Sequence, residues 1–183
     1  MAAPAAGHRA AVALVVPLVA GAAVSVVLGV YGSLHTPTGI AVNVAGFSGP
    51  QPAKAWLATV VVVLALVQLA SALAMYGKLG GGAPAWVAPV HRWSGRLAFL
   101  VSIPVAMHCL YALGFQSFDT RVLLHSLLGC FFYGAFVAKM LTLSRKDAPS
   151  WLLPVAGGAV FTALVGLWLT SSLWFFTTFG IIR

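Results

Sequence analysis

Two histidines stand out in this otherwise apolar chain, because imidazole is the side chain that most often binds metals in proteins. His108 and His125 lie in the stretch HCLYALGFQSFDTRVLLHSLLG, on either side of a short polar break. An unpartnered polar group in an apolar interior costs several kcal/mol. A chain that keeps two imidazoles in such surroundings has a use for them, so this pair is the first candidate for chemistry.

The composition indicates a protein that lives in a lipid bilayer. Hydrophobic residues make up 61% of the 183 residues and charged residues only 7%, whereas a soluble domain carries roughly 25% charged residues. The net charge of +8 comes from ten basic and two acidic side chains. The basic residues are scattered and form no run, which argues against a nucleic-acid-binding protein.

Five apolar stretches have the length of about 20 residues that a membrane-spanning helix needs. They cover residues 10–31, 55–76, 92–114, 120–143 and 151–179. Segments rich in proline and glycine connect them, and the chain contains no internal repeat. We therefore expect an all-α integral membrane bundle of five transmembrane helices that forms a single domain over residues 1–183.

The distribution of basic residues predicts the orientation of the spans. With five spans, the two ends of the chain lie on opposite sides of the membrane. The N-terminal side carries Arg9, Lys78, Arg92, Arg96, Lys139, Arg145 and Lys146, and the other side carries Lys54, Arg121 and Arg183. Because basic residues favour the cytoplasmic side, we expect a cytoplasmic N-terminus, an external C-terminus and a multi-pass protein of the bacterial inner (plasma) membrane.

The two histidines of the opening stretch are predicted to lie at one depth in the bundle. His108 lies six residues before Gly114, and His125 lies five residues into the fourth span. At 1.5 Å per residue they are roughly 9 and 8 Å below the outer boundary, on antiparallel helices. An iron between them would give each ring nitrogen a partner, as in helical bundles that hold haem. The sequence thus predicts one haem b with His108 and His125 as metal ligands.

Two neighbours of His125 fit a haem site. Gly129 follows one turn later on the same face and leaves room for a flat porphyrin. Arg121 comes one turn earlier, toward the outer surface, where the haem propionates would need a cation. Each residue taken singly is more often part of helix packing. A zinc or copper site would need a third or fourth ligand, and only His35 is nearby.

Two further histidines have open roles. His35 lies in the 32–54 loop and either is plain loop, lines the outer haem pocket, shuttles a proton or replaces a haem ligand. His91 lies 17 residues before His108, about 100° away from its helical face. It either anchors the third span at the cytoplasmic boundary or binds a second, inner haem. No histidine occupies the inner ends of the second, fourth and fifth spans, so we expect one haem.

Three other polar residues have simpler predicted roles. Gln68 and Ser71 are isolated in the second span and are expected to form hydrogen bonds across helices. Asp119, or Thr120 beside it, is expected to cap the fourth span.

The phrases HRWSG and HSLLG, with a histidine near the end of the preceding span, resemble the cytochrome b561-like superfamily. That resemblance implies a helical bundle with two b haems held by histidines on four helices, passing electrons between the membrane faces. On it, His108 and His125 would be outer-haem ligands, and His91 would stand where an inner ligand belongs. The fourth histidine is absent, and the matched pair is on adjacent rather than alternate helices. These departures argue against a haem pair and leave a single outer haem.

A second resemblance covers most of the chain. The phrases HRWSGRLAF, HCLYALGF and RVLLHSLLGCFFYGAFVAK are similar to an uncharacterised family of small bacterial five-helix membrane proteins. This likeness implies no activity.

Bis-histidine ligation closes the iron coordination, which suits electron transfer better than substrate binding. We expect a membrane-bound b-type cytochrome, an electron-transfer component rather than a stand-alone enzyme. It would carry electrons between quinol or another membrane donor and an exported or complex-bound redox partner. The alternative is a non-catalytic membrane anchor or assembly subunit of a larger respiratory-type complex. A transporter or channel is disfavoured, because the spans contain no acidic residue and no pair of broken helices.

Overall fold

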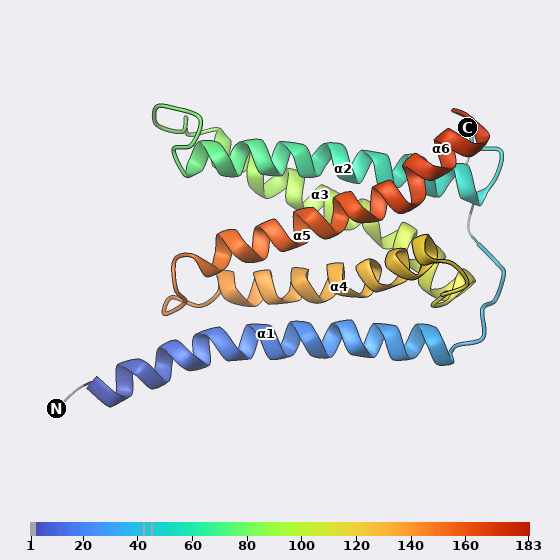
Figure 1. The fold of residues 1–183 in the computed structure, drawn as a ribbon. Coiled ribbons are helices and arrows are strands. Elements are labelled where there is room, and N and C mark those ends of the chain that lie inside the picture. The colour runs from blue at the N-terminus through green and yellow to red at the C-terminus, as the bar shows by residue number, and fades with distance from the viewer. Residues whose placement is uncertain (1–2, 42, 45) are drawn as a thin grey trace. The chain divides into compact units, whose positions relative to one another are not determined.

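The computed structural model describes the chain from residue 3 to residue 183 apart from residues 42 and 45, with side chains from residue 11 onward. Every regular element in this part is helical (Figure 1). The elements are α1 (Ala3–Leu34), α2 (Pro50–Met75), α3 (Val87–Met107), η1 (His108–Leu113), α4 (Thr120–Leu143), α5 (Leu152–Trp168), η2 (Leu169–Leu173) and α6 (Trp174–Phe179).

Five helices in the described part are long and apolar enough to cross a membrane. They are Ala11–Leu34, Pro50–Met75, Val87–Leu113, Thr120–Leu143 and Leu152–Phe179. At most 28% of the most apolar window of any of them is buried. Large apolar side chains such as Val26 and Leu100 are 63% and 58% exposed, which suits a surface covered by lipid. The predicted all-α fold with five spans is confirmed, and the chain is a multi-pass membrane protein.

Two spans begin earlier than predicted. α2 begins at Pro50 rather than residue 55, because proline fits the first helical position, where its missing N–H loses no partner. α3 begins at Val87 rather than residue 92, since a turn from the carbonyl of Pro84 to the N–H of Val87 (3.0 Å) leads directly into the helix. As a result Lys54 and His91 are each the fifth residue of a helix.

The chain divides into two compact units. The first comprises residues up to Thr36 and Phe115–Leu167, and the second comprises Pro37–Gly114 and Trp168–Arg183. The single domain expected from the sequence stays a prediction.

In the first unit, α1 and α4 run antiparallel and side by side (Figure 1), with small residues along their contact. A Cβ atom on Gly21 would lie 2.5 Å from the carbonyl oxygen of Gly134 and 2.9 Å from the Cβ of Ala138. Farther along, Gly29 faces the Sγ of Cys130. The two backbones therefore approach as closely as small residues permit, which is how membrane helices gain packing energy.

In the second unit, α2 packs antiparallel against α3 and, in its first half, against the end of the fifth span. The indole N–H of Trp168 donates to the hydroxyl of Thr59 (2.9 Å), and that of Trp56 donates to the carbonyl of Ile182 (3.0 Å). The Trp56 ring also meets Phe176 edge-on, with ring centroids 5.3 Å apart. Tryptophan side chains thus join the first half of α2 to the end of α5, to α6 and to Ile182.

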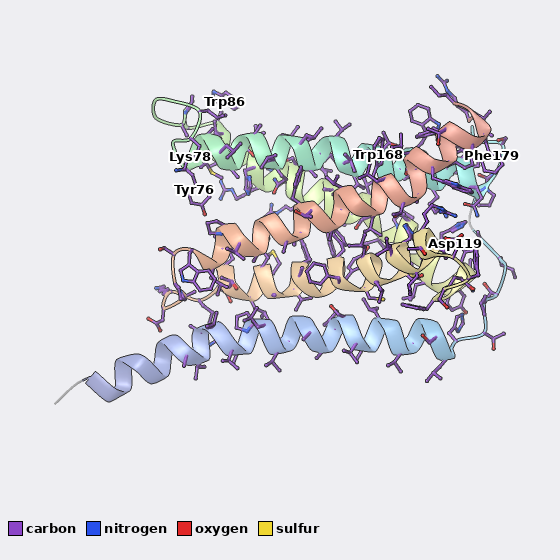
Figure 2. The ribbon with its side chains drawn as sticks, viewed as in Figure 1. Tyr76, Lys78, Trp86, Asp119, Trp168 and Phe179 are labelled. Atoms are coloured by element: carbon purple, nitrogen blue, oxygen red, sulfur yellow. The ribbon has the colours of Figure 1, made fainter. Side chains whose placement is uncertain are left out.

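The turn between α2 and α3 carries side chains typical of a membrane boundary. Tyr76, Lys78 and Trp86 gather there (Figure 2), and all three are exposed. Aromatic rings with polar edges and basic side chains favour the headgroup region. Glycines with φ between 68° and 81° allow the tight turn; they are Gly77, Gly80 and Gly81.

Candidate functional site

His108 begins a change in helical geometry. It follows Pro104, whose ring lacks the N–H that would bond one turn back. From His108 to Leu113 the backbone is a π-helix, a wider turn that often marks functional sites. The carbonyls of Tyr111 and Ala112 accept hydrogen bonds from Thr38 (3.3 Å) and Gly39 (3.1 Å), so the loop after α1 ties down the end of this turn.

The imidazole of His108 is buried without satisfying all of its polar atoms. The side chain is only 9% exposed, and its Nε2 atom has no hydrogen-bond partner. Only one other buried side-chain atom of the described residues shares this condition, the hydroxyl of Ser172 in η2. A buried ring nitrogen without a partner forfeits a hydrogen bond to water, so a ligand that accepts its lone pair would stabilise this arrangement.

The residues predicted to complete the haem site belong to the first unit, whereas His108 belongs to the second. His125 and Gly129 are half-buried on α4. A Cβ atom on Gly129 would meet only Leu167 at an ordinary 3.9 Å, so packing against α5 does not require glycine there. The pairing of His108 with His125 and the porphyrin contact of Gly129 stay predictions.

Arg121 forms an ion pair with Asp119, the residue that caps its helix. Its Nη2 lies 3.8 Å from the Oδ2 of Asp119, and both side chains are partly exposed. Asp119 also caps α4, accepting a hydrogen bond from the N–H of Val122 (2.8 Å), which confirms the predicted cap. Arg121, the cation predicted to bind the haem propionates, thus already has the carboxylate of Asp119 beside it.

His35 lies just beyond the last residue of α1. Its ring stacks on Tyr31, with centroids 5.1 Å apart and planes 12° apart, and its Nδ1 lies 3.5 Å from the Tyr31 hydroxyl. Its backbone N–H donates to the Tyr31 carbonyl (2.8 Å), so the helical turn carries on to it. His35 is thus tied to the first unit, rather than free in a loop.

His91 belongs to a polar cluster between α2 and α3. Gln68 donates to the carbonyl of His91 and to the hydroxyl of Ser94 (2.8 Å). The Nδ1 of His91 lies 2.9 Å from the Oγ of Ser71. The predicted cross-helix bonds of Gln68 and Ser71 are therefore confirmed, and the prediction that His91 sits at the very start of the third span is wrong. The residue lies one turn inside and packs against α2.

Ser71 connects this cluster to the backbone of its own helix. Its hydroxyl donates to the Val67 carbonyl (2.6 Å) and lies 2.9 Å from the Nδ1 of His91. Gly95 keeps room for Gln68, since a Cβ there would lie 3.1 Å from its Oε1. The histidine, serine and glycine of HRWSG thus have a packing role.

Residues 13–183 match the model of a family described as a family of unknown function, DUF6529. The chain belongs to the DUF6529 family. Searches of the curated proteins and of the solved structures found no match. The match to DUF6529 includes every candidate residue considered above. The resemblance to b561-like cytochromes stays a prediction.

The DUF6529 chain has no group of three or more histidine, cysteine, aspartate or glutamate side chains placed to hold a metal ion in its described part. A zinc site needs about four such ligands. A haem needs only axial ligands, because the porphyrin supplies the other four.

Lys54 of this DUF6529 member was predicted to lie in the loop before the second span, and the structure corrects that prediction. Lys54 lies inside α2, in the same unit as His108. The sequence GPQP (49–52) signals this earlier helix start. Proline favours the first helical position, so α2 begins ahead of Lys54.

The first unit of the DUF6529 chain also has an open apolar groove of about 650 Å³. Its walls come from α1, α4 and Phe115, and include Gly29, Leu34, Leu127, Cys130 and Phe131. The hydroxyl of Ser33 on its edge donates to the Gly29 carbonyl (2.8 Å). The groove therefore offers mainly hydrocarbon contacts.

Proposed function

We propose that this chain is a membrane-bound b-type cytochrome that holds one haem b with His108 as an axial ligand. The observation that carries the proposal is the buried Nε2 of His108, which has no hydrogen-bond partner. A neutral imidazole in this state presents a lone pair that a metal can accept. The second ligand would be His125, the histidine that the sequence predicts at the same depth.

The donor set fits a haem better than a bare metal ion. In the described residues no third histidine, cysteine or carboxylate joins a cluster around His108. When bound, the haem would supply one-electron chemistry, and two imidazole ligands would leave no open position for oxygen or substrate. The residues of the chain would bind the iron, exclude water through burial, and set its reduction potential.

The place of the site defines the class of partner. His108 lies near the end of the third span that the basic residues assign to the outer face. The electron donor is quinol or another membrane-bound reductant, and the acceptor is an exported or complex-bound redox protein. The protein resides in the bacterial plasma membrane with its N-terminus in the cytoplasm.

The decisive experiment is an absorption spectrum of the full chain, purified in detergent, before and after reduction with dithionite. We expect a b-type difference spectrum that disappears in His108→Ala and in His125→Ala. His35→Ala and His91→Ala are the matched controls and should keep the spectrum, because Tyr31 and Ser71 respectively already engage these rings. Size-exclusion elution and helix content check that each variant is folded.

Two results would contradict the proposal. A wild-type spectrum that survives both substitutions would remove His108 and His125 as ligands. A halved haem content in His91→Ala would instead indicate a second, inner haem.

The open groove favours a second candidate, a non-catalytic anchor or assembly subunit. Its lining is almost entirely apolar and belongs to two membrane-spanning helices, so a helix of a larger complex could pack there. This function expects colourless wild-type protein that co-purifies with a fixed membrane partner.

A further inference from the structure

The contact between α2 and α3 places Lys54 opposite His108. Gln68 and Ser94 are joined by a hydrogen bond of 2.8 Å. Lys54 is 14 residues before Gln68, and His108 is 14 residues after Ser94, along helices that run in opposite directions. Two heptads bring a residue back to nearly the same face, with a drift of about 20° per heptad. Lys54 and His108 therefore lie at one depth on facing helix sides, about 21 Å from the polar cluster.

The fold agrees with this register. Lys54 and His108 belong to the same compact unit, in which α2 packs against α3 and η1 continues α3. Lys54 lies in the second turn of α2, and His108 directly follows α3.

Lys54 is a cation with no anionic side chain paired to it among the described residues. It is half-buried and makes no ion pair with any residue that the structure describes. The chain has only two acidic residues, and one of them, Asp119, lies beside Arg121. The first turn of α2 contains no acidic side chain, although the positive end of its dipole lies there. The charge of Lys54 and the helix end both favour an anion at this place.

We propose that Lys54, rather than Arg121, binds a carboxylate of the cofactor that His108 ligates, namely a haem propionate. This inference rests on the proposed function. The buried, unpartnered Nε2 of His108 indicates the ligand, and Lys54 supplies the positive charge at the same depth. Lys54 is thus a positioning residue that also tunes the iron.

The sign of the tuning follows from Coulomb's law. A fixed positive charge near the iron disfavours the ferric state, which carries one more positive charge than the ferrous state. Lys54 therefore raises the reduction potential of the haem. Removal of its charge should lower that potential.

The test measures haem content and midpoint potential in the full-length protein, purified with haem in a neutral detergent. Lys54→Met removes the positive charge, and Lys54→Arg keeps it. Arg121→Met tests whether Arg121 binds the propionate instead. Lys78→Met removes an equal charge from an exposed residue of the same unit and controls for net charge.

We expect Lys54→Met to lower the ferrous-to-ferric ratio about tenfold at the wild-type midpoint, a shift of about 59 mV for one electron. The Lys54→Arg, Arg121→Met and Lys78→Met proteins should stay near the wild type. Loss of haem in Lys54→Met with retention in Lys54→Arg would support the proposal as well, because only the charged side chain would then hold the cofactor.

Other outcomes overturn it in distinguishable ways. A coloured Lys54→Met protein with an unchanged potential would mean that Lys54 only reaches the lipid headgroups. A shift confined to Arg121→Met would return the role to Arg121. Haem loss in both Lys54 variants, with retention in Lys78→Met, would mean a packing role. Colourless wild-type protein would remove the proposed function and this inference together.

Discussion

At the scale of single residues, two histidines of the second unit differ in whether their ring nitrogens have hydrogen-bond partners. The Nδ1 of His91 lies 2.9 Å from the Ser71 hydroxyl, and the His91 carbonyl accepts a hydrogen bond from Gln68. His108 is more deeply buried, and its Nε2 lacks a partner. The first ring is explained by helix packing. Helix packing does not explain the second ring in this way, because a polar atom buried without a partner is costly.

Replacement of Gln68 by leucine should weaken the α2–α3 contact without affecting haem. The variant loses two interhelical hydrogen bonds, to His91 and Ser94, and such bonds contribute about 0.6 kcal/mol each in membrane proteins. We expect a loss of about 1 kcal/mol, measured by denaturant titration in detergent. Gln51→Leu, on an exposed residue of the same helix, is the control.

Equal stability of the Gln68→Leu and Gln51→Leu proteins would contradict the structural role of the cluster. Loss of haem from Gln68→Leu alone would instead connect the cluster to a cofactor.

At the scale of elements, the closest approach of α1 and α4 depends on glycine. A Cβ atom on Gly134 would overlap the Oγ of Ser25 and the backbone oxygen of Gly21. The serine side chain can turn away, whereas the backbone of α1 can yield only if the helices separate. The contact is therefore specific to glycine and not only to a small residue.

Gly134→Ala should destabilise the first unit. The added methyl group forces apart a packed contact, which typically costs about 1–3 kcal/mol. Thermal unfolding in detergent, followed by circular dichroism, measures the loss. Gly157→Ala in α5 is the matched control, because a Cβ there meets nothing within 4 Å. A Gly134→Ala protein as stable as Gly157→Ala would show that α1 and α4 are farther apart than described.

At the scale of the whole molecule, orientation in the membrane decides which partners can reach the proposed haem. Basic residues are concentrated on the side of Lys78, Arg92 and Arg145. The positive-inside rule therefore predicts that this side lies in the cytoplasm and that the end of the third span lies outside.

Labelling of single cysteines in intact cells tests this orientation. In a chain with Cys109 and Cys130 replaced by alanine, Ser48→Cys and Ala85→Cys are introduced at exposed positions of opposite connections. A membrane-impermeant maleimide should label the cysteine at position 48 at once, and the one at position 85 only after permeabilisation. The reverse pattern would place His108 near the cytoplasmic face and exclude an exported electron partner.

The sequence by itself determined what depends on lipid and on local geometry. Five long apolar stretches must become helices, because every backbone group in a bilayer has to find its partner within the helix. The cap at Asp119 was also readable, since it needs only a side-chain oxygen three residues before an N–H. An isolated polar residue such as Gln68 indicated a hydrogen bond to another helix, but the sequence did not indicate which residues would be its partners.

Only the tertiary structure decided which faces meet, because hydropathy measures affinity for lipid and not contact with a particular neighbour. Pairing of α2 with α3 gave the Nδ1 of His91 a partner, left the Nε2 of His108 unpartnered, and by helix register brought Lys54 to the depth of His108. Pairing of α1 with α4 made Gly134 indispensable, whereas Gly157, an equally plain glycine in sequence, faces open space. Burial and partnership arise from helix register, which is a property of two segments together.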